Sequence, residues 1–321
     1  MRSECIAAAR RIGPAVVCIA VWIALSACGK RSGEAAVEAP MTSNASAQAA
    51  AATPSTAPPP PSAATGSAPS EPPLLAVQRT REMMGTIIQM TIVGLPEERA
   101  APALSAAMAE MSRLEGLLSE WRDDSEISRL ARGELELTST STEVREVLDF
   151  CERLKSTSRG AFDVAFAAAA ADLDAPGRRA IDPTGVVKGW AVDRAGELLG
   201  AMGVTHAAIN AGGDILVRGD RPWRIGIQHP WERDKTAQIV AVTNGAIATS
   251  GNYERGDHVV DARTGRPAIG LTAVSVIASN LALADGYATT ALALGDEGMG
   301  WLATRPDVVA IGITDDRRVV K

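Results

Sequence analysis

Apolar residues recur every three or four positions in two segments of this sequence, which is the spacing of one helical face. They are Leu104, Met108, Met111, Leu114 and Leu118 in the first segment, and Val144, Val147, Leu148, Cys151 and Leu154 in the second. We therefore expect helices over 97–121 and over 144–154, the latter with Gly160 as its stop. A third helix is expected over 187–202, and a fourth over 281–294, where the sequence is apolar almost all round.

Short β-rich runs, separated by Gly, Asn and Asp, predict strands. The first strand is expected to begin at Glu82 and to end near Gly94, and the others lie at 206–210, 214–219, 223–228, 238–243, 246–251, 273–279 and 308–314. Because the helices come first and most strands follow, we predict an α+β fold rather than repeated βαβ units. Its sheets are expected to be mixed or antiparallel and to pack against the helices.

Residues 1–28 have the pattern of an export signal. Three arginines precede an apolar run, Pro14 to Leu25, which is shorter than the ~20 residues that span a bilayer. The run ends in Leu-Ser-Ala-Cys-Gly, which resembles a bacterial lipobox with Cys28 as the lipid-bearing cysteine. We expect a lipid anchor at Cys28, and the alternative is an ordinary cleaved signal followed by a chance cysteine.

Residues 29–76 consist mainly of Ala, Ser, Thr, Pro and Gly, and half of the eighteen prolines lie between Pro40 and Pro73. Such a segment buries too little apolar surface to offset the entropy of ordering it, so we predict a disordered tether. The folded domain is then expected at 77–321. Of the four cysteines only Cys151 lies in that domain, which excludes an internal disulfide there.

The charge and the aromatic content argue against nucleic acid as a partner. The net charge is −6, whereas phosphate contacts require a basic surface. Aromatic residues make up only 3% of the chain, too few to suggest stacking platforms for single strands. We therefore expect no nucleic-acid partner.

One carboxylate stands out in the apolar segment 281–294. Asp285 lies there with Thr289 one turn later on the same helical face. A buried lone carboxylate is costly unless it is paired or bound to a metal, and oxygen ligands of this kind suit Mg²⁺. In the plainer alternative, Asp285 is exposed or complements the helix dipole in the first turn.

Two glycine-containing turns carry further polar residues. The segment from Asp182 to Gly189, with Lys188, leads into a helix and could hold an anionic ligand, or be an exposed turn with a surface lysine. The segment Asn210-Ala-Gly-Gly-Asp214 lies between two predicted strands. Its glycines permit either a close approach to a ligand or a plain hairpin turn.

The segment from Ala248 to Pro267 gathers hydroxyl groups, a histidine, an aspartate and arginines within twenty residues. A Ser-His-Asp triad is possible in composition, but the motif GxSxG is absent and nothing orients a serine toward His258. His206 and His229 have no comparable neighbours and are expected to be structural or surface residues.

Taken in order, these segments resemble the ApbE family, the FAD:protein FMN transferases of bacterial envelopes. One of them, Ser-Glu-Trp-Arg-Asp-Asp-Ser-Glu-Ile, is similar to the family pattern S-[TY]-[YW]-x-x-x-S-x-[IL]. The matching segments are 84–86, 119–127, 160–164, 182–189, 210–214, 246–253, 258–267 and 284–289. Eight pieces in the same order make coincidence implausible. The resemblance implies an α+β fold of the ApbE type with a shortened middle segment.

The resemblance also implies a Mg²⁺-dependent enzyme that cleaves FAD and attaches FMN by a phosphoester bond to a threonine of an envelope redox protein. It assigns the metal to Asp285, Thr289 and a backbone carbonyl near Gly185, and Ala288 stands where some members have another aspartate. The flavin contacts that it implies are Met84, Trp121, Ala161, Phe162, Asp163, Asp182, Lys188 and Val260.

Catalytic assistance and location follow from the same resemblance. His258 would help to deprotonate the acceptor threonine, and Asp261 would orient His258. Many members are lipoproteins, which agrees with a lipid at Cys28 and implies a folded domain that faces the periplasm of a bacterial envelope.

The middle of the chain departs from the family pattern. Only eighteen residues separate Asp163 from Asp182, and Asp182 is followed by Pro-Thr instead of Leu-Gly. This shortening could remove part of the cofactor wall, so a catalytically impaired flavin-binding lipoprotein remains the alternative. A solute-binding or scaffold lipoprotein would leave the cluster around His258 unexplained.

Overall fold

The computed structural model describes residues 75–166, 181–232, 234–252 and 259–321. Its helices are α1 (Glu97–Leu118), α2 (Glu126–Ala131), α3 (Thr142–Thr157), α5 (Thr184–Ala201), α7 (Leu281–Leu294) and α8 (Gly298–Ala303), with 3₁₀ turns η1 (Leu137–Ser139) and η2 (Gly295–Glu297). Its strands are β1 (Ala76–Met83), β2 (Thr86–Val93), β3 (Ala207–Ala211), β4 (Asp214–Arg218), β5 (Trp223–Gln228), β6 (Thr236–Val242), β7 (Gly245–Gly251), β8 (Val260–Asp261), β9 (Arg266–Pro267), β10 (Leu271–Ala278), β11 (Val309–Thr314) and β12 (Val319–Val320). The predicted α+β class is confirmed.

One eight-stranded sheet organises the fold, in the order β1-β2-β3-β4-β7-β10-β11-β12. Every neighbouring pair in it is antiparallel. The hairpin β5–β6 is inserted between β4 and β7, and β8 pairs with β9 in a second small hairpin. Of the two predicted sheet types, the described strands therefore form the antiparallel one.

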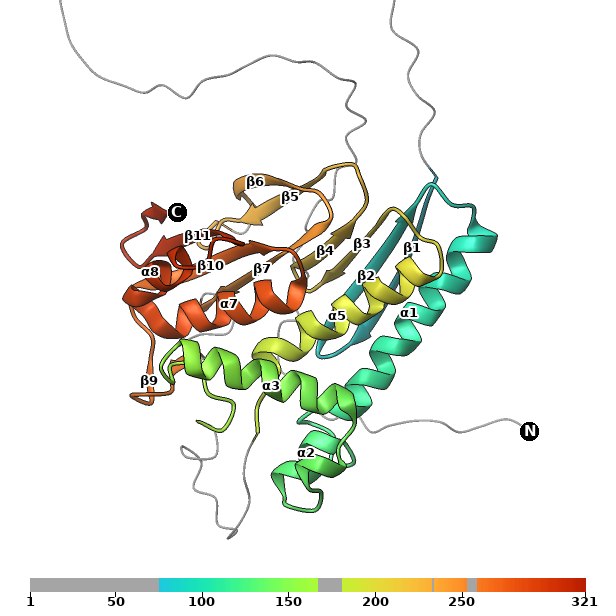
Figure 1. The fold of residues 1–321 in the computed structure, drawn as a ribbon. Coiled ribbons are helices and arrows are strands. Elements are labelled where there is room, and N and C mark those ends of the chain that lie inside the picture. Colours follow the sequence, from blue (N-terminus) through green and yellow to red (C-terminus); the bar gives the residue numbers. More distant parts are fainter. Residues whose placement is uncertain (1–74, 167–180, 233, 253–258) are drawn as a thin grey trace, which may run out of the picture. The chain divides into compact units, whose positions relative to one another are not determined.

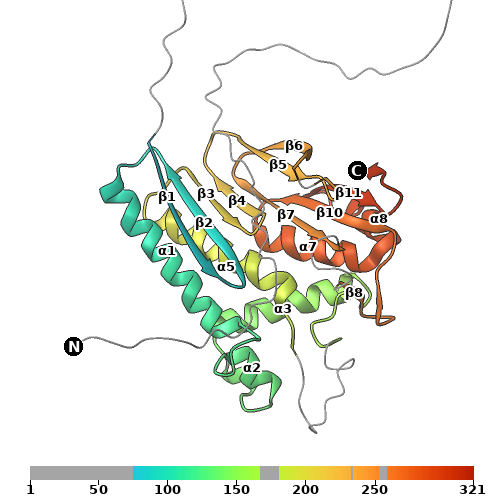
Figure 2. The same cartoon turned by 180° about the vertical axis from the view of Figure 1, so that it is seen from behind.

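The large sheet is covered on both faces. Helices α1, α5 and α7 lie along one face with α3 across them, and the hairpin β5–β6 lies over the other face (Figures 1 and 2). Because successive strand residues point to opposite faces, Ile209 and Leu216 join the core under the helices, whereas Ala208 and Ile215 join the core under the hairpin. This double burial explains why β3 and β4 are continuous apolar runs.

The N-terminal part of the sheet differs from the sequence expectation. The single strand expected from Glu82 is wrong, because β1 and β2 form a hairpin with the two-residue turn Met84-Gly85. Both turn residues have positive φ, 52° and 69°, as a type I′ turn requires. Strand β1 is an exposed edge strand without an apolar pattern, and it includes Ala76, which the sequence placed in the tether.

The helices mostly lie where the apolar spacing predicts them. Helix α1 begins at Glu97 as expected but ends at Leu118, so Trp121 lies beyond it. Helix α3 is confirmed, and its apolar face includes Cys151, which is buried as a free thiol. None of the helices in the described ranges is long and apolar enough to cross a membrane.

Helices α5 and α7 approach each other closely through glycine. A Cβ atom added at Gly189 would lie 2.5 Å from the carbonyl oxygen of Leu281 and 2.9 Å from Cβ of Asp285. A Cβ atom at Gly185, one turn earlier, would lie 3.0 Å from Cγ2 of Thr289. The two glycines therefore allow the helices to approach closely. Gly185 lies opposite Thr289, and Gly189 lies opposite Asp285.

The start of α7 is fixed to α5 by a partly buried carboxylate. Asp193 of α5 accepts hydrogen bonds of 2.8 Å from the backbone N–H groups of Leu281 and Ala282. Asn280 caps the same helix by accepting a hydrogen bond from N–H of Leu283 at 2.9 Å. The N–H groups of the first turn of α7 are thus satisfied while the helix is held at one position along α5.

We predict that Gly189→Ala destabilises the fold by about 1 to 3 kcal/mol, because the new methyl group would collide with the backbone of α7. The matched control is Gly116→Ala near the end of α1, where a Cβ atom meets nothing within 4 Å. The control is expected to be neutral or stabilising by up to ~1 kcal/mol. Chemical denaturation measures both, and equal midpoints for the two variants would contradict the close packing.

Candidate functional site

Asp285 is the fifth residue of α7 and only 5% exposed, so it is neither a surface residue nor part of the first turn. Its Oδ2 accepts a hydrogen bond of 3.1 Å from N–H of Gly189. Burial raises its pKa to about 7, although the positive charge of Lys188 acts in the opposite direction. The plainer alternatives for this residue are therefore wrong, and the fold keeps an ionisable group in its interior.

Lys188 forms an ion pair with Asp214, which is only 4% exposed. The other oxygen of that carboxylate, Oδ1, accepts a hydrogen bond of 2.9 Å from N–H of Thr249 on β7. The glycines before Asp214 form the hairpin turn between β3 and β4, where Oδ1 of Asn210 accepts a hydrogen bond from N–H of Gly213. Lys188 is therefore paired with the buried carboxylate of Asp214 and close enough to Asp285 to act on it electrostatically, so it is not a freely exposed lysine.

Thr289 lies one turn after Asp285 and faces two other elements. Its Oγ1 is 3.1 Å from Oγ of Ser250 on β7, and its methyl group faces Gly185 at the start of α5. The structure thus brings together Gly185, Asp285 and Thr289, three of the residues assigned to the metal. Ala288, the fourth, is fully buried, and its methyl side chain offers no oxygen ligand.

The residues around Asp285 suit a hard divalent cation with few protein ligands. In the described ranges, no three His, Cys, Asp or Glu side chains gather as a metal cluster, so one carboxylate, one hydroxyl and one backbone carbonyl would form the donor set. Mg²⁺ commonly takes one or two carboxylates and keeps water and phosphate oxygens for its other positions. Asn252 follows β7 two residues after Ser250, and its buried Oδ1 has no hydrogen-bond partner among the described residues.

Several residues assigned to the flavin meet at the start of α5. The ring of Phe162 approaches Gly185, where an added Cβ atom would lie 3.3 Å from Cε2 of Phe162. The backbone of this loop connects its neighbours, because Val164 accepts a hydrogen bond of 2.8 Å from N–H of Asp182. The carbonyl of Ala161 accepts one of 3.1 Å from N–H of Ala262, which follows Val260 and Asp261 of β8.

Two aspartates of this group are fixed by local contacts. Asp163 forms an ion pair of 2.9 Å with Lys155 of α3. Oδ1 of Asp182 accepts hydrogen bonds from N–H and Oγ1 of Thr184, at 3.0 and 2.6 Å, in the turn that leads into α5. The turn predicted from the sequence between Asp182 and Gly189 is therefore present, with helix α5 beginning at Thr184.

Met84 and Trp121 lie near the other end of the group, beside the end of α1. Met84 occupies the β1–β2 turn, and its N–H donates a hydrogen bond of 2.7 Å to Oε1 of Glu115. Trp121 is 86% exposed, which is unusual for so large an apolar side chain. Glu120 precedes Trp121, and burial, followed by the negative charge of Asp182 nearby, raises the pKa of Glu120 to about 7.

Sequence reasoning gave no role to four further site residues, Glu115, Glu120, Asp214 and Ser250. Glu115, Asp214 and Ser250 each contact an assigned residue, and Glu120 lies close enough to Asp182 for the two charges to interact. Three of them stand inside matched motifs, which was the available signal. Glu115 lies on α1 outside every motif, and only its contact with Met84 reveals it.

The carboxylate of Asp261 is occupied by Arg263. It accepts hydrogen bonds of 2.7 to 3.0 Å from the backbone N–H, Nε and Nη2 of Arg263. Burial pushes the pKa of Asp261 upward, but these hydrogen bonds outweigh burial and hold the pKa below its ordinary value. His258 lies outside the described residues, as do Cys28 and residues 167–180 of the shortened segment.

His206 and His229, the two histidines outside the matched motifs, have structural roles. His206 stacks on Trp223 with ring centroids 5.2 Å apart, and Nδ1 of His229 accepts a hydrogen bond from N–H of Glu232. Burial lowers the pKa of His206 below its ordinary value. Both residues therefore match the expectation for structural or surface residues.

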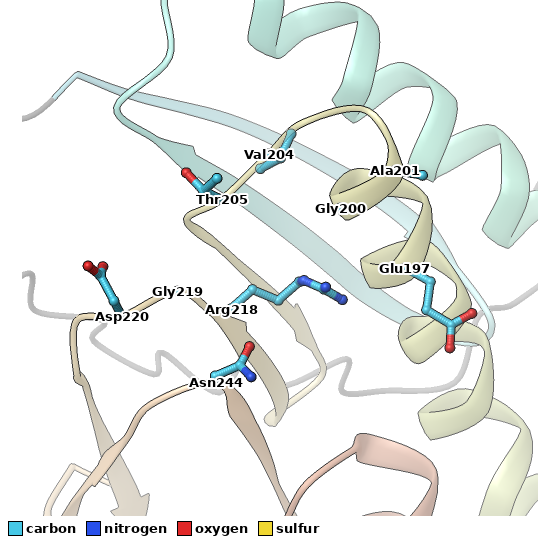
Figure 3. A pocket seen from close by; sticks show the side chains of 9 residues that line it. All are labelled: Glu197, Gly200, Ala201, Val204, Thr205, Arg218, Gly219, Asp220 and Asn244. Atoms are coloured by element: carbon cyan, nitrogen blue, oxygen red, sulfur yellow. The ribbon is translucent and has the colours of Figure 1, made fainter.

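A cavity of about 550 Å³ lies at the opposite end of α5 from this site (Figure 3). Arg218 extends from β4 across it toward Gly200, and Glu197, Thr205 and Asn244 contribute polar side chains. None of the residues assigned to the metal or the flavin lines it. A second cavity of about 560 Å³ lies beside β8, β9 and the end of α7, and Asp261 is part of its wall.

Comparisons of the sequence and of the fold with known proteins indicate the same family. The sequence pattern of the ApbE family matches residues 84–180 and 171–312. The chain belongs to the ApbE family. Its fold agrees, because the flavin transferase ApbE from Vibrio cholerae superposes with a TM-score of 0.68 at 23% identity, over 77% of this chain and 97% of that one. The ApbE protein from Thermotoga maritima gives the same TM-score at 20% identity.

Curated relatives cover the chain to different extents. The FAD:protein FMN transferase of Klebsiella pneumoniae is 26% identical over 289 residues, which span 73% of this chain and 83% of that protein. The protein of that name in Rhodobacter capsulatus is 38% identical over 148 residues, which span 42% of this chain and 28% of that protein. The superpositions on the ApbE structures confirm the ApbE type of fold that was predicted for this chain.

Removing the positive charge of Lys188 is expected to destabilise this ApbE protein. Lys188→Met leaves Asp214 buried and unpaired, and we expect a loss of about 2 to 3 kcal/mol, since breaking a buried ion pair costs several kcal/mol and Lys188 is partly exposed. Adding Asp214→Asn should recover much of this loss. Chemical denaturation of the two single variants and the double variant measures the coupling, and additive effects would contradict the ion pair.

Proposed function

We propose that this chain cleaves FAD and attaches FMN to a threonine of an envelope redox protein in a Mg²⁺-dependent reaction. The transferase class rests on family membership and on the curated relatives, which are FAD:protein FMN transferases. The proposed Mg²⁺ dependence is supported by the contact between α5 and α7, which brings Gly185, Asp285 and Thr289 together.

The reaction exchanges the phosphoanhydride bond of FAD for a phosphoester bond to threonine. The threonine oxygen attacks the phosphorus atom of the FMN half, the bond to the bridging oxygen of the pyrophosphate breaks, and AMP leaves with that oxygen. The threonine hydroxyl loses its proton, so a nearby base accelerates the step. His258, outside the described residues, is our candidate for that base. The carboxylate of Asp261 stays bound to Arg263 in the hairpin that follows His258.

The residues around Asp285 would hold the metal ion. Asp285 and Thr289 would supply side-chain oxygens, and Gly185 a backbone carbonyl, to Mg²⁺. When bound, the ion would neutralise charge on the pyrophosphate oxygens, which is the main need of phosphoryl transfer. The close packing at Gly185 and Gly189 holds these metal-binding groups in place before the ion or FAD binds, so little reorganisation of the protein is needed.

The flavin would lie over the start of α5. Phe162 and the loop 161–164 would offer an apolar wall beside Asp182, and Met84 and the exposed Trp121, near the end of α1, would add further contacts. Lys188, which the resemblance also assigns to the flavin, pairs with Asp214 at the start of β4. The aromatic side chains would pack on ring faces of the cofactor.

The location of the enzyme follows from its first residues. The lipobox-like sequence supports a lipid at Cys28, and residues 29–76 would hold the domain away from the membrane surface. We therefore place the catalytic domain in the periplasm of a bacterial envelope, where redox proteins that carry covalent flavin would meet it.

Loss of the buried carboxylate is expected to abolish transfer. For Asp285→Asn we expect no flavin fluorescence on a denatured threonine-bearing acceptor after incubation with FAD and Mg²⁺, whereas the wild-type protein labels it and stops when EDTA is added. The matched control is Asp149→Asn, an exposed residue of α3, which should label the acceptor at the wild-type rate. Normal transfer by a folded Asp285→Asn protein would overturn the metal assignment, and FAD binding without any transfer by the wild type would favour the impaired alternative.

Loss of the exposed tryptophan is expected to weaken flavin binding. Trp121→Ala removes a stacking partner worth about 1 kcal/mol, so the dissociation constant for FAD should rise several-fold. Titration of FAD fluorescence measures the change. Trp231→Ala serves as the control, because Trp231 contacts Arg317 and lies in no flavin motif. Equal affinity of both variants would show that Trp121 does not contact the flavin.

A further inference from the structure

Two further glycines, Gly196 and Gly200, lie near the end of α5 and face β4 instead of α7. A Cβ atom added at Gly196 would collide with Cδ2 of Leu216. A Cβ atom added at Gly200 would lie 2.9 Å from Nη2 of Arg218 and 3.3 Å from its Cζ. The absence of side chains at these two positions therefore leaves the space in which the guanidinium of Arg218 lies against the last turn of α5.

The sheet fixes the backbone of Arg218 from both sides. Arg218 is the last residue of β4 and pairs with Ala207 of β3. The antiparallel register of β4 and β7 pairs Val217 with Gly245, so that the next position brings Asn244 opposite Arg218. The side chain of Arg218 is half-buried. The strands thus hold its backbone, and α5 covers its charged end.

The guanidinium of Arg218 has no acceptor in the protein. Among the residues that the structure describes, none accepts a hydrogen bond from it or forms an ion pair with it. Glu197, on the same part of α5, pairs with Arg194 at 3.0 Å. The carboxylate of Asp220 points away from Arg218 in Figure 3, and its side chain is 96% exposed. An arginine keeps its charge and its five N–H donors at every physiological pH, so this half-buried fork lacks an oxygen partner.

The end of α5 does not use these donors either. The carbonyl groups of residues 198–200 accept hydrogen bonds of 3.0 Å from the backbone N–H groups of residues 202–204. The helix dipole favours a positive charge at this end, but any cation supplies that charge. The planar fork of a guanidinium is instead matched to the two oxygens of a carboxylate or a phosphate group.

We propose that Arg218 anchors a binding site for a small molecule that carries a carboxylate or phosphate group, in the cavity of about 550 Å³ at this end of α5 (Figure 3). The guanidinium would donate two parallel hydrogen bonds to two oxygens of that group. Thr205 and Asn244 line the same cavity, and their side chains have no hydrogen-bond partner among the described residues, so they supply donors for further oxygens. The volume lies in the range of small-molecule sites, about 300 to 1,000 Å³.

This site is separate from the residues around Asp285. Gly200 follows Gly185 by fifteen residues on one helix, which corresponds to about 20 Å along its axis. None of the residues assigned to the metal or the flavin lines the cavity. The inference therefore does not rest on the proposed function, and its tests need neither FAD nor Mg²⁺.

Thermal unfolding of the full chain in EDTA, with inorganic phosphate or acetate replacing chloride at constant ionic strength, measures binding of the two kinds of group. We expect the unfolding midpoint of the wild type to rise with at least one of them, and the larger rise identifies the preferred group. The dissociation constant should increase at least about tenfold in Arg218→Lys, which keeps the charge without the fork, and in Arg218→Met. Arg224→Met, at an exposed position of β5, is the control and should behave as the wild type.

Two results of this titration would overturn the proposal. One is a rise of equal size in the wild type and Arg218→Met, which would place anion binding elsewhere on the protein. The other is a wild-type midpoint that responds to neither phosphate nor acetate beyond the effect of chloride.

Gly200→Ala tests the geometry without removing the charge. The new methyl group would displace the flexible end of Arg218, whereas α5 would gain a better helix former. We therefore expect a variant at least as stable as the wild type that binds the anion several-fold more weakly. Gly116→Ala, where a Cβ atom meets nothing within 4 Å, should bind the anion as the wild type does. Unchanged anion affinity in Gly200→Ala would contradict a binding fork held against α5.

Discussion

The contact between α5 and α7 is the constraint on which the candidate site depends. Glycine at 185 and 189 removes two side chains from the facing surface of α5, so that the backbone of α7 comes within reach. Thr289 and Asp285 are then brought against the start of α5, and Asp193 fixes the position of α7 along the pair. Without this approach, the carboxylate, the hydroxyl and the backbone carbonyl would lie on separate elements.

The interior between α5, α7 and the sheet holds more carboxylates than cations. Two carboxylates, Asp214 and Asp285, are buried among α5, α7 and the sheet, Asp193 is partly buried beside them, and Lys188 is the neighbouring cation. Backbone N–H groups supply much of the remaining stabilisation, from Leu281, Ala282, Thr249 and Gly189. A site that starts with excess negative charge and few fixed cations is suited to a divalent metal ion, because the ion supplies the missing positive charge.

The flavin wall is assembled differently, from loops that the sheet and the helices hold at their ends. The β1–β2 turn contacts α1, and the turn before α5 contacts the loop 161–164, although these segments span about a hundred residues of sequence. Their contacts are single hydrogen bonds, such as that from N–H of Met84 to Glu115 and that from N–H of Asp182 to the carbonyl of Val164. Such loops keep a binding surface adjustable while the rigid helices fix the reacting groups.

The sequence by itself determined much of this protein. The apolar spacing located α1 and α3, the short β-rich runs located the central strands, and the ordered motifs located the family and most residues assigned to the site. These features are local or are carried by residue identity, so neighbouring positions suffice to reveal them. The edge strand β1 escaped because it lies exposed and has no apolar alternation.

Only the tertiary structure decided which groups meet. Examples are the burial of Asp285, the pairing of Lys188 with Asp214, and the hydrogen bonds from Arg263 to Asp261. The free energy of a charged group depends on its solvent exposure and on its neighbours in space. Those neighbours come from distant segments, and a one-dimensional pattern does not contain them.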